Sequence, residues 1–262
     1  MTSPPSTRAI ALVHGQPGAG SDWNPVIARL AGSPRIHAVD RPGYRSSLLP
    51  AAGLVANAQQ LLADLDTAGL VRPLLVGHSY GGGIAITAAA LEPDRFSGLV
   101  LIASVGPNCL DGWDRLLAAP VTGTVCALAA WWLTPWAARA GLAGIERRRG
   151  RPLGPDEYLN WECWANARHP TGAMWRTFLT EQRDLVRTLP ELSARAGTLR
   201  LPTLIIADPA DGMIPVATSH ELHRLIRPSE LQLVESGGHS LPRRRPALIA
   251  GSISDFLAGL DR

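Results

Sequence analysis

The chain has 262 residues, of which 46% are hydrophobic and 18% charged, and it carries a formal net charge of +3. This length and apolar content allow one large core and exclude an intrinsically disordered chain, and the mild charge argues against a nucleic-acid partner. All 25 basic residues are arginine, which excludes chemistry that depends on a lysine amine or a P-loop lysine.

The first hundred residues alternate short apolar runs with stretches of helical spacing. Continuous apolar runs are typical of buried parallel strands, and apolar side chains at helical spacing predict helices that cover a sheet. Strands are expected at 9–13, 36–39, 74–76 and 96–103, and helices at 22–30, 54–70 and 82–91. The alternation returns near the C-terminus, with strands expected at 201–207 and 231–234 and helices at 216–226 and 246–260.

Between these two regions the alternation stops. Residues 105–198 have helical character, are interrupted by several prolines and contain seven of the eight tryptophans. Strand–helix alternation favours a parallel sheet with helices on both faces. We therefore expect an α/β fold with a mainly parallel, doubly wound sheet built from residues 1–104 and 199–262. Residues 105–198 are expected to form an inserted helical cap beside a ligand site at the carboxyl ends of the strands.

A possible nucleophile lies between an expected strand and an expected helix. Residues 77–81 read Gly-His-Ser-Tyr-Gly and match the pattern G-x-S-x-G. In a nucleophile elbow, a strained turn between a strand and a helix lifts the serine hydroxyl out of the sheet, and the flanking glycines leave room for that turn. Ser79 is therefore the candidate nucleophile, and an ordinary glycine-rich turn is the alternative interpretation.

A serine hydroxyl is a poor nucleophile near neutral pH and needs a base that is oriented by an acid. His239 follows an expected strand in a glycine-rich loop and is the candidate base. Asp211 follows the preceding expected strand and is the candidate acid, with Asp208 as its rival; the plainer role of Asp208 is to cap a turn. The chain order of serine, acid and histidine is the one that an elbow-type hydrolase uses.

The loop after the first expected strand is a candidate for binding the oxyanion. Residues 14–18 read His-Gly-Gln-Pro-Gly. A tight glycine-containing loop at this place can direct a backbone N–H group at a developing oxyanion, together with the N–H of the residue after the nucleophile. This assigns the oxyanion hole to Gln16 and Tyr80.

Taken together, these motifs resemble the α/β-hydrolase superfamily. The resemblance is carried by His14-Gly15, the elbow around Ser79, Asp211 followed by Pro215, and Gly238-His239. Residues 40–44, Asp-Arg-Pro-Gly-Tyr, also look like the family's Asp-x-x-Gly turn. The resemblance runs from about residue 9 to residue 260 and implies the α/β-hydrolase fold, with a helical cap after the strand that ends near residue 103.

The chain also departs from the family pattern. Arg45 and Asp208 stand where the family often has glycine. His14 comes so early that the usual leading β-hairpin is expected to be missing, as in the small plant esterase and hydroxynitrile lyase branch. The lyases of that branch depend on a lysine, which this chain lacks. Ser79 argues against the haloalkane dehalogenase and epoxide hydrolase branches, whose nucleophile is an aspartate.

The tryptophans of the expected cap allow two compatible interpretations. They can form a small helical core, or several of them can line an apolar ligand pocket, because ligand sites are mostly apolar with a few polar groups. The candidate substrate-binding residues are Trp113, Trp131, Trp132, Trp136, Trp161 and Trp164.

Other features bear on the location of the protein and its partners. Residues 116–138 contain no charged side chain, but Pro120, Gly123 and Pro135 are expected to interrupt a membrane span, so an apolar cap facing a pocket or peripheral lipid is favoured. The N-terminus lacks a signal-peptide pattern, and three widely spaced cysteines favour a reducing compartment, so a cytoplasmic location is expected. His220 and His223 have a spacing that a metal could use, but no third ligand is expected.

The sequence therefore predicts a serine hydrolase that needs neither cofactor nor metal. Its expected reaction is cleavage of a small carboxylic ester with an apolar or aromatic acyl group, through an acyl-enzyme. A carbon–carbon bond hydrolase, a lactonase and a cofactor-free haloperoxidase or perhydrolase remain alternatives on the same fold, because function depends on the site. A ligand-binding, receptor-like homologue that does not catalyse is the alternative from a different class.

Overall fold

The computed structural model describes residues 8–32, 34–150, 168–169 and 172–260. The chain divides into two compact units. The first comprises Met1–Arg41, Leu54–Cys109 and Thr188–Arg262, and the second comprises Pro42–Gly53 and Leu110–Arg187. The second unit therefore contains most of the region expected to form the cap, together with a short segment from between the second strand and the second helix.

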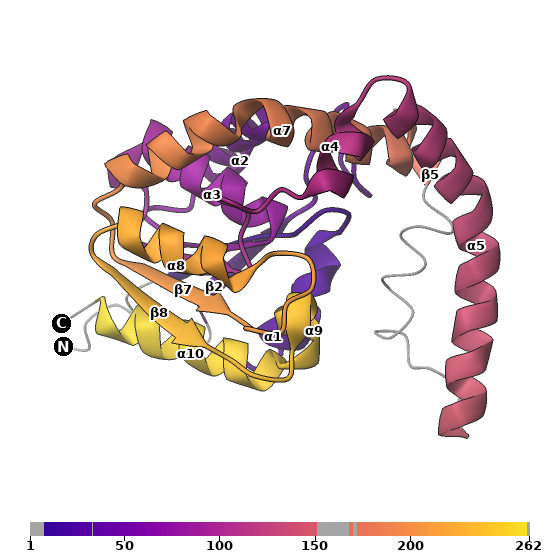
Figure 1. The fold of residues 1–262 in the computed structure, drawn as a ribbon. Helices are drawn as coiled ribbons and strands as arrows, with labels where there is room; N and C mark the ends of the chain where they lie inside the picture. The colour runs from indigo at the N-terminus through magenta and orange to yellow at the C-terminus, as the bar shows by residue number, and fades with distance from the viewer. Residues whose placement is uncertain (1–7, 33, 151–167, 170–171, 261–262) are drawn as a thin grey trace, which may run out of the picture. The chain divides into compact units, whose positions relative to one another are not determined.

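The first unit contains a six-stranded sheet in the order β2-β1-β3-β4-β7-β8, and every neighbouring pair is parallel (Figure 1). Its strands are β1 (Ala9–Val13), β2 (Arg35–Val39), β3 (Leu74–His78), β4 (Gly98–Ile102), β7 (Thr203–Ala207) and β8 (Ser229–Leu233). All six strands were expected from the apolar runs, and the bounds of β1 are those of its run. The predicted parallel α/β sheet is confirmed.

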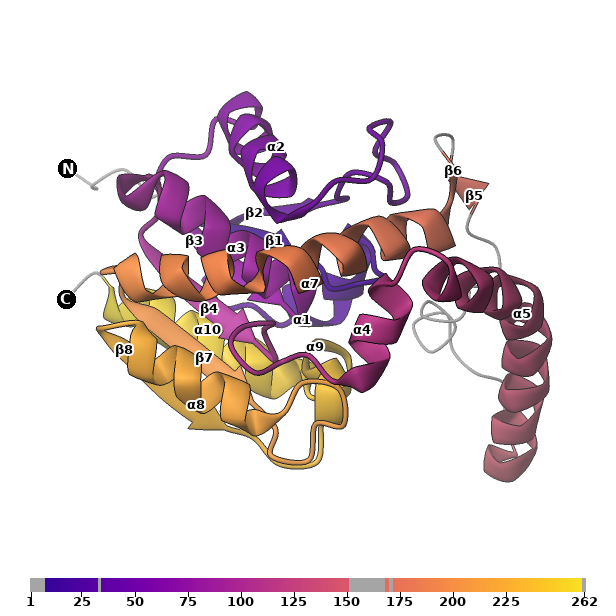
Figure 2. The same ribbon diagram turned by 45° about the horizontal axis from the view of Figure 1, so that its top comes forward.

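Helices cover both faces of this sheet. In Figures 1 and 2, α1 and α10 lie on one side, and α2, α3 and α8 lie on the other. These helices are α1 (Asn24–Ile27), α2 (Leu54–Thr67), α3 (Tyr80–Leu91), α8 (Val216–Leu225) and α10 (Pro246–Gly259). Every residue of β1, β4 and β7 is buried, because strands covered on both faces have no solvated side.

One face of the sheet forms a single apolar core with α1 and α10. Val76 and Val100 of the central strands pack in one cluster with Val26 of α1 and with Ile249 and Ile253 of α10. A core that spans several strands fixes their register, because a shift of one residue along a strand would turn its core side chains, such as Val76 and Val100, to the opposite face of the sheet. The carboxyl ends of the strands are thereby held at defined positions.

The helix expected at 22–30 is the clearest difference from the sequence analysis. A 3-10 helix, η1 (Gly20–Trp23), precedes the short α1, and residues after Ile27 continue only as turns, with the N–H of Arg29 donating to the Val26 carbonyl at 2.9 Å. Pro25 lies in the first turn of α1. The tighter turns before and after α1 place apolar side chains at nearly the same spacing as an α-helix. The apolar pattern at 22–30 therefore predicted a longer α-helix than the chain forms.

The second unit is mainly helical. It contains α4 (Gly112–Ala118), α5 (Thr122–Arg149) and a two-stranded antiparallel sheet of β5 (Arg168–His169) and β6 (Gly172–Ala173). The helix α7 (Met174–Thr198) begins in this unit and ends in the first unit. Three connecting or short helices belong to the first unit: η2 (Pro93–Arg95), η3 (Gly238–Ser240) and α9 (Leu241–Arg244). The insertion of helices between β4 and β7 agrees with the expected fold class.

The prolines of residues 105–198 do not all interrupt helices. Pro120 lies between α4 and α5 as expected, but Gly123 and Pro135 lie inside α5, and Pro190 lies inside α7. A proline in a helix removes one hydrogen bond but does not end the helix where the neighbouring turns remain intact. Among the described residues, no helix combines the length and the apolar character that crossing a membrane would require.

Candidate active site

Ser79 has an unusual backbone conformation between β3 and α3. Its φ of 53° and ψ of −122° lie in a region that residues other than glycine rarely adopt. Three hydrogen bonds hold it there: its N–H donates to the Ile102 carbonyl at 2.9 Å, and its own carbonyl accepts from Gly82 N at 2.9 Å and Val105 N at 3.1 Å. The turn is therefore fixed by the neighbouring strand and by the first turn of α3.

The two glycines of the elbow are required by close approach of other backbone atoms. A Cβ atom on Gly77 would lie 2.4 Å from the Gly81 carbonyl oxygen. A Cβ on Gly81 would lie 2.4 Å from the carbonyl oxygen of Val13, at the end of β1. Both distances are well inside van der Waals contact, so α3 can pack this closely on the sheet only with glycine at these positions.

The structure brings Ser79, His239 and Asp211 together. Ser79 Oγ lies 3.0 Å from His239 Nε2, and His239 Nδ1 lies 2.9 Å from Asp211 Oδ2. The three residues follow β3, β8 and β7, and the carboxyl ends of parallel strands meet at one edge of the sheet. The Asp211 side chain is 2% exposed and that of His239 is 13% exposed. This geometry is that of a nucleophile, a base and an acid linked in a row.

Asp211 is held as a carboxylate. Its Oδ1 accepts hydrogen bonds from the N–H groups of Met213 at 2.8 Å and Ile214 at 3.0 Å, while Oδ2 faces the imidazole. Burial raises the pKa of Asp211. The hydrogen bond and charge of His239 and the two backbone N–H groups together lower it by more, so the net pKa lies below its ordinary value. An ionised Asp211 accepts a hydrogen bond from Nδ1–H, so Nε2 of His239 is the nitrogen that can accept a proton from Ser79.

Asp208, the rival acid, faces the backbone of the histidine loop. Its Oδ1 accepts from Ala210 N at 2.8 Å, and its Oδ2 accepts from Gly237 N at 2.7 Å and Gly238 N at 2.6 Å. These hydrogen bonds lower the pKa of this buried carboxyl group, and the one from Ala210 has the largest effect. Asp208 thus caps its own turn and also joins the loops after β7 and β8. In the sequence, the only indication of this second role is that Asp208 stands at a position where the family often has glycine.

His78 contacts the same loop from the other side. Its Nε2 lies 2.9 Å from the carbonyl oxygen of His239, and the two imidazole centroids are 5.1 Å apart. Burial, followed by the charge of His239, lowers the pKa of His78 to about 3, so the ring is neutral near neutral pH and Nε2–H donates. The sequence did not predict this contact, because the chain order does not show which carbonyl group lies beside the His78 ring.

Of the two residues assigned to the oxyanion hole, Tyr80 follows the nucleophile directly and Gln16 lies in a loop that approaches it. Tyr80 is the first residue of α3, and the backbone N–H groups at a helix N-terminus favour a negative charge. Gln16 follows Gly15, and a methyl group on Gly15 would lie 3.1 Å from Ser79 Cβ. The loop after β1 therefore runs against the elbow, as a role in binding an oxyanion requires.

The tryptophans assigned to substrate binding belong to the second unit. Trp113 lies on α4 and is 68% exposed, whereas Trp131, Trp132 and Trp136 lie on α5. Trp161 and Trp164 lie outside the described residues. The role of this set in binding substrate stays a prediction.

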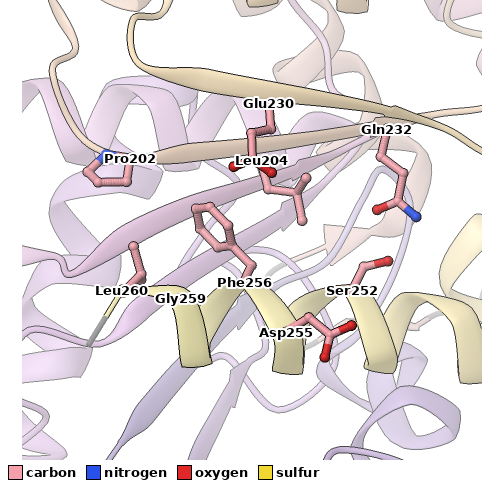
Figure 3. Close-up of a pocket in the computed structure, with 9 residues that line it drawn as sticks. All are labelled: Pro202, Leu204, Glu230, Gln232, Ser252, Asp255, Phe256, Gly259 and Leu260. Atoms are coloured by element: carbon pink, nitrogen blue, oxygen red, sulfur yellow. The ribbon is translucent and has the colours of Figure 1, made fainter. Parts of the chain in front are cut away.

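A separate groove lies between the edge of the sheet and α10 (Figure 3). It has a volume of about 570 Å³. Its lining residues are Pro202, Leu204, Glu230, Gln232, Ser252, Asp255, Phe256, Gly259 and Leu260. Pro202 precedes β7 and Glu230 is near the start of β8, so the groove includes the amino ends of strands whose carboxyl ends lead to Asp211 and His239. The groove is thus distinct from the site around Ser79.

In the described part of the chain, no group of three or more histidine, cysteine or acidic residues is arranged to hold a metal ion. His223, one of the two histidines with metal-like spacing, instead has its Nδ1 2.9 Å from the Ser229 hydroxyl.

Comparison with known proteins relates the whole chain to hydrolases. Residues 10–251 match the family model described as "Alpha/beta hydrolase family". The chain is 28% identical over 261 residues to 2-hydroxy-6-oxo-2,4-heptadienoate hydrolase of Pseudomonas putida, covering 96% of this chain and 90% of the relative. It is 29% identical to 2-hydroxymuconate semialdehyde hydrolase of a Pseudomonas species, covering 96% and 87%. The crystal structure of haloalkane dehalogenase DbeA from Bradyrhizobium elkani superposes with a TM-score of 0.77 at 19% identity, covering 99% of this chain and 93% of that one.

Proposed function

Because the chain belongs to the alpha/beta hydrolase family, we propose that it is a serine hydrolase in which Ser79 is the nucleophile, His239 the base and Asp211 the orienting acid. The observation that carries this proposal is the pair of hydrogen bonds at 3.0 and 2.9 Å that join the three side chains. The proposed substrate is a small carboxylic ester with an apolar or aromatic acyl group.

Acylation begins when Ser79 Oγ attacks the carbonyl carbon of the ester. A new C–O bond forms, the π electron pair moves to the carbonyl oxygen, and the hydroxyl proton passes to His239 Nε2. The Asp211 carboxylate stabilises the resulting imidazolium through the proton on Nδ1. The backbone N–H groups of Gln16 and Tyr80 donate to the oxyanion, which is the largest charge that develops in the transition state.

The tetrahedral intermediate then expels the alcohol. The C–O bond to the leaving group breaks, and His239 gives the leaving oxygen its proton. In the second half-reaction His239 takes a proton from water, the hydroxide attacks the acyl-enzyme, and the carboxylic acid leaves as Ser79 recovers its proton. The same base serves both steps because its tautomer is fixed by Asp211 throughout.

The ester specificity is supported by composition more than by contacts. Seven tryptophans fall within the insertion between β4 and β7, and an apolar, aromatic lining suits an apolar or aromatic acyl group. In this proposal the insertion, residues 105–198, acts as the cap that selects the substrate, and the loops of the sheet perform the chemistry.

Carbon–carbon bond hydrolysis is the second candidate. Two relatives that align over nearly the whole chain are named as hydrolases of an oxo-dienoate and of a semialdehyde. Neither name contains an ester, so hydrolysis of such a substrate has to break a carbon–carbon bond beside a ketone or aldehyde. The attack of Ser79 on a carbonyl carbon would be shared, and the leaving group would be a carbon atom that needs a proton.

A fluorophosphonate probe and a substrate panel test the proposal. The panel contains 4-nitrophenyl esters of graded acyl length, a lactone and an oxo-dienoate. We expect the wild type to be labelled and to prefer apolar or aromatic acyl groups, and Ser79→Ala to lose labelling and ester turnover by a factor of about 10⁴ or more. Ser252→Ala, on α10, is the control and should behave like the wild type.

The possible outcomes separate the candidates. Turnover of the oxo-dienoate without esterase activity would favour the carbon–carbon hydrolase, and faster lactone cleavage would favour a lactonase. Equal labelling of the wild type and Ser79→Ala would remove Ser79 from the mechanism. A folded wild type that binds an apolar carbonyl compound but is not labelled would favour the ligand-binding homologue.

A further inference from the structure

We infer that Arg41 is a positioning residue of the oxyanion hole and that, with His14, it holds the Gly15 carbonyl so that the Gln16 N–H is oriented toward the oxyanion. The inference deepens the proposed function and rests on it. Neither residue is expected to touch the substrate.

The position of Arg41 follows from the sheet order. It lies two residues after β2, which pairs in parallel with β1, and the loop after β1 carries Gln16. The neighbouring Asp40 anchors this turn by accepting a hydrogen bond from Gly20 N at 2.8 Å. Because the two strands end at the same edge of the sheet, the side chain of Arg41 can reach the backbone of the loop after β1.

Two side chains donate to the carbonyl oxygen of Gly15. Arg41 Nη2 lies 2.8 Å from this oxygen, and His14 Nδ1 also lies 2.8 Å from it. All these groups are buried, with Arg41 2% and His14 1% exposed. A carbonyl oxygen has two lone pairs, so these contacts occupy the accepting capacity of the Gly15 oxygen and fix its direction.

The hydrogen bonds of His14 define which of its nitrogens carries the proton. Its Nε2 lies 3.2 Å from the backbone N of Arg41, which can only donate, so Nε2 accepts and Nδ1 carries the hydrogen. Burial, followed by the charge of Arg41, lowers the pKa of His14 well below its ordinary value and keeps the ring neutral. His14 is therefore a donor to Gly15 O and an acceptor from Arg41 at the same time.

The orientation of Gly15 O determines that of the Gln16 N–H. Both groups belong to one peptide unit, which is not among the cis bonds of the chain, and in a trans peptide the C=O and N–H vectors point in opposite directions. Fixing the oxygen on one side therefore fixes the N–H on the other. A charged donor on the oxygen also polarises the peptide and strengthens its N–H as a donor.

Arg41 also contacts the second residue of the proposed hole. Its Cζ lies 5.1 Å from the centroid of the buried Tyr80 ring, within the range of a cation–π interaction. The same guanidinium thus bonds to the peptide that contains the Gln16 N–H and packs on the side chain of Tyr80. Arginine suits this double contact, because its planar guanidinium can donate from its edge while its face lies against the ring, whereas a lysine ammonium has no flat face.

The test compares Arg41→Met and Arg41→Lys with the wild type on 4-nitrophenyl benzoate and on its thiono analogue, in which sulfur replaces the carbonyl oxygen. Sulfur is a poor hydrogen-bond acceptor, so a weakened hole should slow the oxygen ester more than the thiono ester. We expect Arg41→Met to lower kcat for the oxygen ester about 10- to 100-fold, with KM changed less than about threefold. The oxygen-to-sulfur rate ratio should fall by at least about fivefold.

Arg95→Met is the matched control. Arg95 also donates to a backbone carbonyl, that of Leu70 at 2.6 Å, and pairs with Asp66 at 2.8 Å, but it lies on η2 before β4. We expect this variant to melt at a lower temperature with an unchanged rate ratio. A folded Arg41→Met that slows both esters equally, or neither, would overturn the inference. If Arg41→Met does not fold, Arg41→Lys decides: its ratio should fall at least about threefold, and an unchanged ratio would overturn it.

The rate at which fluorophosphonate labels Ser79 separates this inference from the proposed function. If no ester is hydrolysed but the wild type is labelled, the ester proposal fails, while slower labelling of Arg41→Met still supports the role of Arg41. Labelling of Arg41→Met at the wild-type rate would overturn that role whether or not esters are hydrolysed. A wild type that is never labelled would overturn both.

Discussion

The loops at the carboxyl ends of the sheet and the helices of the second unit differ in how their side chains are held. At this edge of the sheet, polar side chains bind backbone groups of neighbouring loops: Asp208 accepts from Gly237 and Gly238, and His78, at the end of β3, donates to the His239 carbonyl. Each of these contacts satisfies a group that would otherwise be costly to bury. The positions of the proposed catalytic side chains are thereby determined by several strands at once.

The second unit also has polar contacts between segments far apart in the chain, but its helices expose large apolar side chains. Arg183 of α7 donates to the carbonyls of Ala118 and Pro120 at 3.1 Å, where α4 gives way to α5. Large apolar side chains on the same unit stay in solvent, with Val121 74% and Leu133 66% exposed. This contrast accords with our proposal that the sheet loops perform the chemistry and that the helical insertion selects the substrate. Three changes can break or sharpen this comparison.

The largest effect is expected from Asp211→Asn. The amide would donate to His239 Nδ1 or fail to accept its proton, so the imidazole would no longer present the tautomer that accepts the proton of Ser79. We expect kcat for an ester to fall about 10⁴-fold while the melting temperature changes little. Asp64→Asn, on α2, is the control. A loss of less than tenfold would show that Asp211 is not the orienting acid.

The second effect concerns the pH dependence of stability. The pKa of His78 is about 3 in the folded protein and 6.5 for an ordinary histidine, so between these pH values the unfolded chain binds a proton that the folded chain does not. Stability should therefore fall as the pH decreases below 6.5, by up to about 1.4 kcal/mol per pH unit from this group, and level off near pH 3. His14, whose pKa is also lowered, acts in the same direction.

His78→Gln isolates the contribution of His78, because the amide can still donate to the His239 carbonyl but does not titrate. Urea unfolding between pH 7 and 4 should show a shallower fall for this variant than for the wild type. His223→Gln, on the exposed face of α8, is the matched control for the substitution of a histidine by glutamine. Identical slopes for all three proteins would contradict a neutral His78 in the folded state.

The smallest effect is expected in the second unit. Arg183→Met removes the hydrogen bonds from α7 to the junction of α4 and α5, and should cost about 1 kcal/mol of local stability. Faster proteolysis of the second unit, with an unchanged rate of Ser79 phosphonylation, would support the division between the units. Slower phosphonylation in this variant would show that the insertion helps to form the site.

Much of the fold was predictable because its signals are local. The run 9–13 became β1 without a shift of either end, and the steric demands of G-x-S-x-G placed Ser79 between β3 and α3. Short helices were harder to predict, since the pattern at 22–30 fits both an α-helix and the mixed 3-10 and α turns that the chain adopts.

The sequence by itself determined the strands, their helices and the order of Ser79, Asp211 and His239, because apolar periodicity and turn sterics depend on near neighbours in the chain. Tertiary structure alone decided which backbone groups the buried polar side chains satisfy. Arg41 meets a carbonyl 26 positions away and Asp208 meets N–H groups 29 and 30 positions away. Such pairings follow from which strands lie side by side and where they end, and no local pattern records that distance.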